Sequence, residues 1–237
     1  MEFRKLKAEE IDCRVSQIAS NYCTLLLYKD ARVDQNILDE TVGAMNWQKR
    51  YVRDNANCIV GIWDDEKKQW VEKEDTGTES FSEAEKGLAS DSFKRACFNW
   101  GIGRELYTAP NIMFFPHKGM IPKGQTSEFF EYKDGKYTTK TRFYVDYIDY
   151  DGNNISDLVI RDHKGNSRFE QLTPKTEKEF DKQFMELKKL IEANEEKDEK
   201  FDRAKFYEYF KVESDNQLNF KQRKEAIELL KKRLESE

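Results

Sequence analysis

The chain has 237 residues, 38% of them hydrophobic and 37% charged, with a net charge of -5 at pH 7. This length and hydrophobic content allow one sizeable core and a smaller module. No apolar run approaches the roughly 20 residues of a membrane-spanning helix, and the charged N-terminus lacks a signal-peptide region, so we expect a cytoplasmic protein with no membrane partner. The negative charge excludes a surface covered by positive potential, so a nucleic-acid site would need a local groove.

The cysteines form no CxxC pair, and each falls in an apolar pattern: Cys13, Cys23, Cys58 and Cys97. We interpret them as reduced thiols of the core, not as disulfides or zinc ligands. The chain has only two histidines, His117 and His163, which disfavours a histidine-based metal site. We expect no metal and no cofactor.

The first part of the chain predicts strands and one short helix. Residues 11–18 and 23–28 alternate in polarity around a polar turn, as two paired strands do. A short helix is predicted next, because helical spacing relates Val33, Ile37, Leu38 and Val42. Gly43 is a natural stop for this helix. Three consecutive strands are then predicted at residues 47–52, 58–63 and 70–74.

The next stretch, Glu83 to Tyr107, indicates one capped helix closed by a glycine-rich turn. Ser82 is a good N-cap, and Glu85 three residues later completes a capping box. Gly101 and Gly103 end the helix where left-handed backbone is needed. Three- and four-residue spacing predicts one buried face made of Ala89, Phe93, Ala96, Cys97 and Trp100.

Two adjacent cations, Lys94 and Arg95, lie off this buried face. Side by side on an anchored helix, they suit the binding of a phosphate backbone, although a solvated helix flank has the same pattern. Trp47 and Trp100 could stack on bases, but core packing is the interpretation that their apolar positions favour. Gly87 and Ser90 make the helix surface before Lys94 small and smooth, which would admit either a nucleic-acid backbone or a neighbouring strand.

The second half predicts a loop, three strands and three helices. Residues 110–125 are rich in proline and glycine and are interpreted as a loop. Strand patterns at residues 142–149, 155–162 and 167–171 are expected to complete or extend the main sheet. Helices are predicted at residues 174–196, 201–210 and 220–234, either as a separate module or packed back on the main domain.

The quoted residues resemble the Rad-fifty-two-like single-strand annealing proteins, especially the phage and prophage group called Sak. The resemblance covers roughly residues 30–110, with order and spacing preserved. In the helix it rests on Asp91, Ser92, Phe93, Lys94-Arg95-Ala96, Trp100, Gly101 and Leu106-Tyr107. Upstream it rests on Arg32-Val33, Gly43, Asn46-Trp47 and Asp75-Thr76-Gly77.

The resemblance implies an α+β fold, in which an antiparallel β-sheet forms a β-β-β-α annealing core beside a small C-terminal helical module. It implies an annealing and oligomerising domain at residues 1–172 and a partner-binding module at residues 173–237. The implied activity is not enzymatic: it is ATP-independent binding and annealing of single-stranded DNA by a homo-oligomeric ring or helical array. The implied partners of residues 173–237 are a host single-strand-binding protein or a phage exonuclease.

The resemblance also implies a set of DNA-binding residues. Lys94 and Arg95 align with the paired basic residues of the family's inner groove, and Arg32 aligns with its upstream arginine. A further basic residue common in the family is replaced here by Phe98, and Arg104 is the candidate to supply that contact. A second strand-holding surface is expected from Lys49, Arg50 and Arg53, with Lys49 and Arg53 on one strand face and Arg50 on the other.

Two alternatives remain open from the sequence. One is a single-strand DNA chaperone that loads another recombinase. The other is a metal-dependent nuclease, for which the acidic candidates are Asp64-Asp65-Glu66 and the trio Asp146, Asp149 and Asp151. No Walker P-loop is present, which disfavours ATP-driven strand exchange.

Overall fold

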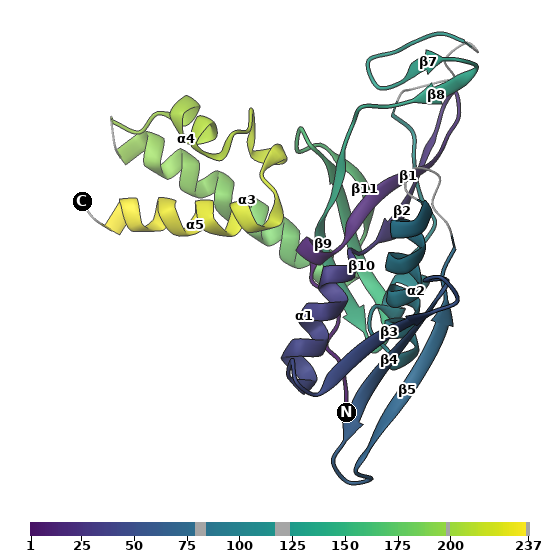
Figure 1. Ribbon diagram of the computed structural model, residues 1–237. Coiled ribbons are helices and arrows are strands. Elements are labelled where there is room, and N and C mark those ends of the chain that lie inside the picture. The colour runs from purple at the N-terminus through teal and green to yellow at the C-terminus, as the bar shows by residue number, and fades with distance from the viewer. Residues whose placement is uncertain (79–83, 117–123, 198–199, 236–237) are drawn as a thin grey trace. The chain divides into compact units, whose positions relative to one another are not determined.

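The computed structural model describes residues 1–78, 84–116, 124–197 and 200–235. They form an α+β fold with antiparallel sheets, as predicted. The chain divides into two compact units (Figure 1). Unit 1 comprises Met1–Asp12 and Leu27–Ala109, and unit 2 comprises Cys13–Leu26 and Pro110–Glu237.

Unit 1 contains a three-stranded antiparallel sheet of β3 (Trp47–Val52), β4 (Asn57–Asp64) and β5 (Gln69–Thr76). Its helices are α1 (Ala31–Val42) and α2 (Ala84–Trp100), with the short 3-10 helices η1 (Ala8–Glu10) and η2 (Arg104–Thr108). The three strands, α1 and α2 confirm the predicted elements, in order, with small differences at their ends, whereas η1 and η2 were not predicted. The predicted N-cap, Ser82, and the side chain of Glu85 lie outside what the structure describes.

Helix α2 packs on one face of this sheet. The buried side chains include Cys58, Val60 and Ile62 from β4, and Phe93, Ala96 and Cys97 from α2. Helix α1 adds Ile37 and Leu38 to the same core and ends at Gly43, whose φ of 84° is left-handed. The predicted stop signals are thus confirmed, including Gly101 and Gly103 after α2, with φ of 107° and 75°.

Unit 2 contains a six-stranded sheet with the order β11-β10-β9-β1-β2-β6. Its strands are β1 (Asp12–Ile18), β2 (Cys23–Tyr28), β6 (Ile112–Phe114), β9 (Phe143–Asp151), β10 (Asn154–Asp162) and β11 (Ser167–Gln171). The edge strands β6 and β11 contact each other, so the sheet is strongly curled. A separate hairpin is formed by β7 (Glu131–Lys133) and β8 (Lys136–Thr138).

Two expectations about these strands are wrong. Strands β9 to β11 do not extend the sheet of β3 to β5, because their hydrogen-bonded neighbours are β1, β2 and β6. Residues 110–125 are not all loop, because β6 pairs with β2 and buries Ile112 and Phe114 on one side while Met113 faces outward. Residues 117–123 of that stretch are not described.

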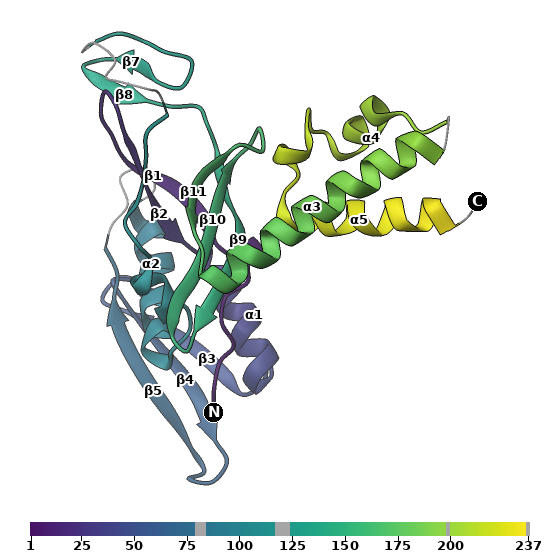
Figure 2. The same ribbon diagram turned by 180° about the vertical axis from the view of Figure 1, so that it is seen from behind.

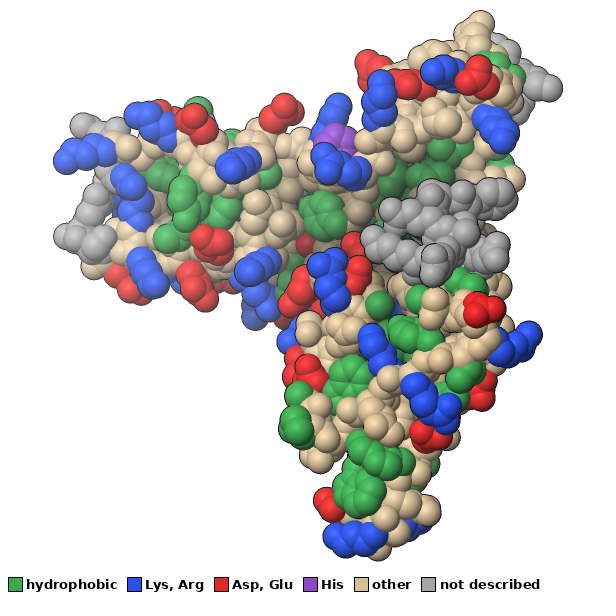
Figure 3. Space-filling model, in the orientation of Figure 1, with side chains coloured by type: hydrophobic (Ala, Val, Ile, Leu, Met, Phe, Trp, Pro, Cys, Tyr) green, Lys and Arg blue, Asp and Glu red, His purple; other side chains and the backbone are tan. Residues whose placement is uncertain are grey.

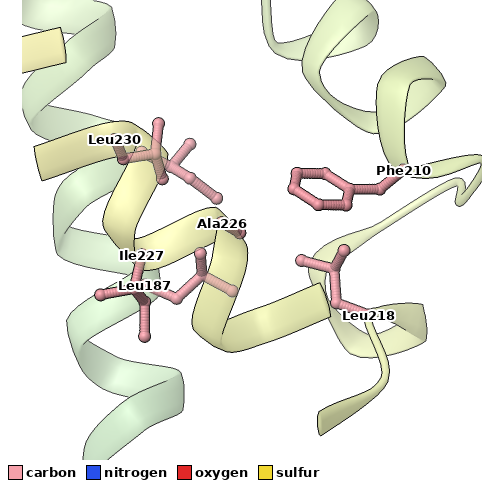
Figure 4. Close-up of a cluster of buried hydrophobic side chains, with 7 residues drawn as sticks. Leu187, Phe210, Leu218, Ala226, Ile227 and Leu230 are labelled. Carbon is pink, nitrogen blue, oxygen red and sulfur yellow. The ribbon is translucent and has the colours of Figure 1, made fainter. Parts of the chain in front are cut away.

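The predicted C-terminal helices are confirmed as α3 (Pro174–Lys197), α4 (Arg203–Phe210) and α5 (Phe220–Glu235), with a 3-10 turn η3 (Asp215–Gln217). Figure 2 shows α3 and α5 lying side by side, and Figure 4 shows the apolar cluster they share. Its buried members are Leu187, Ile191, Phe210, Leu218, Ala226, Ile227 and Leu230. The helices therefore have a core of their own.

The same helices also pack on strand β9. Phe220 of α5 lies 4.7 Å from Tyr147 of β9 and 5.1 Å from Phe180 of α3, between ring centroids. The Phe220 amide donates to the Asp146 carboxylate at 2.8 Å. Compact unit 2 thus includes both these helices and the six-stranded sheet, whereas separate functions for residues 1–172 and 173–237 remain a prediction.

A glycine allows the close approach of α2 to the end of β5. A Cβ atom on Gly77 would lie 2.5 Å from the Ser92 nitrogen and 2.6 Å from the Leu88 oxygen, both in the α2 backbone. Backbone atoms of a packed helix cannot move away cheaply. Gly77 is the last residue of the predicted Asp75-Thr76-Gly77 motif, and its role here is steric.

Gly77→Ala should therefore destabilise unit 1. We expect a loss of about 2 kcal/mol in the free energy of unfolding, in the range of overpacked cores. Gly61→Ala is the matched control, because its Cβ would lie 3.4 Å or more from side-chain atoms only, the nearest being Cγ of Glu72. Urea denaturation of both variants measures the difference, and equal stabilities would contradict the steric role.

Candidate nucleic-acid interface

The buried face of α2 leaves its two adjacent cations on its flanks. Phe93, Ala96 and Cys97 are buried, and the Trp100 indole donates to the Val60 carbonyl at 3.0 Å. The Trp47 ring stacks on Phe93 with a centroid distance of 6.2 Å. Both tryptophans therefore pack against the core but stay half-buried. The predicted buried stripe is confirmed at Phe93, Ala96 and Cys97, whereas Ala89 and Trp100 are half-buried.

Lys94 lies on the flank of α2 that adjoins the start of α1. Its positive charge acts on two carboxylates there, Asp30 and Asp34. Asp30 is the N-cap of α1 and accepts from the backbone and the guanidinium of Arg32, both at 2.8 Å. Hydrogen bonds from Arg32, together with the attraction of Lys94, lower the pKa of Asp30. Lys94 and Arg32 thus both interact with the carboxylate of Asp30.

Arg95 lies on the flank of α2 that faces β5. Its Nε is 3.2 Å from Oδ1 of Asp75, and its side chain is 47% exposed. The Asn99 amide donates to the other oxygen of Asp75 at 3.2 Å and to the Glu74 carbonyl at 3.0 Å. The adjacent pair therefore does not form one cationic spot, since each cation has its own acidic neighbour.

The cations expected on the first strand of the sheet separate. Lys49 faces α2, with its ammonium 4.3 Å from the centroid of the Phe93 ring. Arg50 faces the other side and pairs with Glu72 at 2.9 Å. The opposite orientation of these two residues is confirmed. Arg53 is not on the strand, which ends at Val52: it lies in the following turn with a left-handed φ of 53°.

Arg104 is engaged at the C-terminus of α2. Its guanidinium donates to the carbonyls of Phe98 and Asn99, both at 2.8 Å. Lys73 also donates to the Asn99 carbonyl, at 2.8 Å, and its ammonium lies 4.4 Å from the Trp100 ring centroid. Cations are stabilising at this end of a helix because its last carbonyls carry partial negative charge. Sequence reasoning missed Lys73.

The outer face of the sheet carries two tryptophans that the sequence analysis did not single out. Trp63 and Trp70 form a T-shaped pair with ring centroids 5.5 Å apart, and Trp70 is 38% exposed. Figure 3 shows hydrophobic side chains gathered towards the turn that joins β4 and β5. The alternation along the two strands could have revealed this pair of tryptophans, because Trp63 lies opposite Trp70 in the register.

A buried ion pair lies beside Lys94. Lys29 and Asp34 are 7% and 0% exposed and form a hydrogen-bonded pair. The second oxygen of Asp34, Oδ2, has no hydrogen-bond partner among the described residues. Burial raises the pKa of Asp34 to about 6, against the attraction of Lys29 and Lys94. The burial of Asp34 could have been predicted from the sequence, because Asp34 shares helical spacing with the buried Ile37 and Leu38.

The acidic candidates for a nuclease site have structural partners. Asp64 accepts from the backbone nitrogens of Glu66 and Lys67, both at 3.0 Å, and so closes the turn after β4. Asp146 pairs with Arg161 at 2.7 Å. Among the residues that the structure describes, no three His, Cys, Asp or Glu side chains are arranged to hold a metal ion.

Comparison of the chain with models of protein families, with curated proteins and with solved structures finds no match. None of the described helices is long and apolar enough to cross a membrane. Cys23, Cys58 and Cys97 are free and buried, as expected for core thiols, whereas Cys13 is half-buried.

The position of Lys94 predicts an effect on Asp34. Lys94→Ala should raise the pKa of Asp34 above its value of about 6, because it removes an attraction that favours the charged carboxylate. Arg95→Ala, on the other flank, should leave it unchanged. A carboxyl-carbon NMR titration of both variants measures the shift.

The same substitution predicts a pH dependence of stability. A carboxyl group with a raised pKa in the folded state destabilises that state as pH rises through this pKa. The destabilisation caused by Lys94→Ala should therefore be larger at pH 7 than at about pH 4, where Asp34 is largely protonated. A pH-independent difference between variant and wild type would place Lys94 away from Asp34.

Proposed function

We propose that this protein binds single-stranded DNA and anneals complementary strands without ATP, in phage-type homologous recombination. The observation that carries the proposal is the display of Arg32, Lys94 and Arg95 on α1 and α2. The side chain of Arg32 is 83% exposed and that of Arg95 is 47% exposed. These are also the basic residues of the resemblance to Sak-type annealing proteins.

Annealing demands no bond-making chemistry from such a surface. Duplex formation releases about 1.4 kcal/mol per base-pair step, so the reaction is downhill once two strands meet in register. A protein accelerates it by neutralising phosphates while leaving the base edges free. Cations without exposed aromatic neighbours suit this task, because aromatic platforms would stack and sequester bases.

The intramolecular partners of these cations are weak competitors for phosphate. Arg32 is paired with Asp30 in an exposed position, and the exposed Arg95 is paired with Asp75, whose side chain is half-buried. Exposed ion pairs contribute about 0–1 kcal/mol, so a phosphate can replace the carboxylate at little loss. Lys94 needs no such exchange, because its ammonium forms no hydrogen bond or ion pair within the described ranges.

We propose that the active form is a homo-oligomer, either a ring or a helical array. The net charge of -5 gives a single chain no general attraction for DNA. Repetition of a few cations in adjacent subunits would produce a continuous track. Residues 173–237 are the proposed docking module for a host single-strand-binding protein or a phage exonuclease, through exposed apolar residues such as Met185, Tyr209 and Leu229.

Loss of the two cations of α2 should weaken DNA binding while preserving the fold. We expect Lys94→Ala/Arg95→Ala to lower affinity for an oligonucleotide at least about tenfold. The slope of log affinity against log salt should fall by about 1.4, since each phosphate contact on a single strand contributes about 0.7. Fluorescence anisotropy measures both quantities.

Lys67→Ala/Lys68→Ala is the matched control, because it removes two adjacent cations from an exposed turn of the same unit. This control should retain most of the affinity and salt slope. If the two double variants bind alike, the DNA track lies elsewhere on the protein.

Annealing itself is measured by mixing labelled complementary strands with the full-length chain in EDTA and without nucleotide. We expect a faster fluorescence quench than for free strands, and sedimentation of the protein as an oligomer under the same conditions. Tight binding without faster annealing would favour the alternative role of a chaperone that loads another recombinase. Strand loss only on addition of magnesium would indicate a nuclease.

A further inference from the structure

Unit 2 contains a cavity of about 620 Å³ between strands β10 and β11, helix α3, the η3 turn and the start of α5. Its apolar walls include Phe180 and Phe184, and its polar walls include Asn166 and Gln217. Two arginines, Arg161 and Arg223, complete the lining, and both are more than nine-tenths buried. The volume is that of a typical small-ligand site.

Arg161 has three hydrogen-bond partners and forms a wall of the cavity. It pairs with Asp146 at 2.7 Å and donates to the carbonyls of Gly165, at 2.7 Å, and Asn216, at 2.9 Å. A Cβ on Gly165 would lie 2.8 Å from the Gln217 carbonyl oxygen, so this wall is tightly packed. The geometry of the site is therefore largely fixed without a ligand.

Arg223 differs because its buried Nε has no hydrogen-bond partner and its guanidinium forms no ion pair among the described residues, even though only 7% of the residue is exposed. Its Cζ lies 5.4 Å from the Phe184 ring centroid and 5.9 Å from that of Phe180. The charges of Asp146, Glu170 and Asp215 attract it only from beyond ion-pair distance. Burial and the nearby Arg161 lower its pKa, but an arginine stays protonated.

The charges around the cavity select the kind of anion. Three carboxylates line it on exposed residues, Glu170, Glu177 and Asp181. These carboxylates repel any anion, and they repel a phosphate with up to two negative charges, or a polyanionic nucleic-acid backbone, more strongly than an anion with a single charge. A carboxylate carries one charge and matches the planar donor fork of a single guanidinium. The phenyl rings require that the ligand also have an apolar body.

We propose that this cavity binds a monocarboxylate with an apolar body, in which the carboxylate bonds to Arg223 and the body lies against Phe180 and Phe184. Two sources share this chemistry: a small organic acid, and the C-terminal carboxylate of a polypeptide that ends in an apolar residue. The site does not depend on the proposed DNA binding by unit 1, but its helical lining belongs to residues 173–237, so a polypeptide ligand would be a partner of the proposed docking module.

The test uses the full chain with hydrocinnamate as the probe and its neutral amide as the control ligand. We expect backbone NMR shifts of cavity residues on addition of the acid and a rise in melting temperature by mass action. The amide should bind at least tenfold more weakly. A short peptide ending in phenylalanine, with a free or an amidated C-terminus, then distinguishes the polypeptide source from the small acid.

Arg223→Met keeps the length of the side chain and removes its charge. It should abolish binding of the acid without lowering the melting temperature, because an unpaired buried charge does not stabilise the fold. Lys224→Met, the exposed neighbouring cation, should retain binding.

Three results would overturn the proposal. The first is that the wild type binds the acid and the amide equally well, or that it binds neither of them. The second is unchanged binding of the acid to Arg223→Met. The third is a melting temperature for Arg223→Met several degrees below that of Lys224→Met, because it would assign Arg223 to the fold and not to a ligand.

Discussion

The close packing of α2 on the sheet of β3, β4 and β5 is the constraint on which the arrangement of unit 1 depends. Gly77 lets the backbones meet along the first half of the helix, and the hydrogen bond from Trp100 to Val60 fixes its end. A helix held at these two places cannot turn about its axis. Lys94 and Arg95 are consequently held on opposite flanks, one beside Asp30 and the other beside Asp75.

This arrangement ranks five of the seven candidate cations by what a phosphate would displace. For Arg32, Arg50 and Arg95 it would displace one carboxylate, which is exposed at Asp30 and Glu72 and half-buried at Asp75, and each such surface pair is a weak one. For Arg104 it would displace two carbonyls at the end of α2, which would then lack partners. Lys49 would have to leave the Phe93 ring. Phosphate binding is therefore easiest along the exposed flanks of α1 and α2.

Local sequence signals predicted most elements but not their long-range partners. Alternation, helical spacing and glycine stops depend on neighbouring residues, so α1, α2, β3 to β5 and α3 to α5 were predictable. Membership of a sheet depends on which strands meet, and that is why β9 to β11 were assigned to the wrong sheet. Strand β6 is too short for alternation to be visible, and Arg53 lies just past a strand end that sequence patterns do not mark sharply.

For the site residues too, local properties could be predicted from the sequence, whereas partners distant in the sequence could not. The exposure of Arg32 and Arg95 could be predicted because both lie off an apolar stripe. The ion pairs of Arg95 with Asp75 and of Arg50 with Glu72 could not, because each joins residues 20 or more positions apart. The burial of Arg223 could not be predicted either. Arg223 precedes the buried Ala226 and Ile227 by three and four residues, so helical spacing places it on the apolar face, where an apolar residue is expected.

Buried charges have different partners in the two units. The difference distinguishes charges that stabilise the fold from a charge that is available to bind a ligand. In unit 1, Lys29 and Asp34 are buried together, so that each reduces the unfavourable free energy of burying the other. In unit 2, Arg161 has Asp146 and two carbonyls, whereas the equally buried Arg223 lies over phenyl rings and has no carboxylate within ion-pair distance among the described residues. Packing alone would favour an apolar side chain at that position. A guanidinium held there beside a cavity destabilises the empty fold and is compensated when an anion binds.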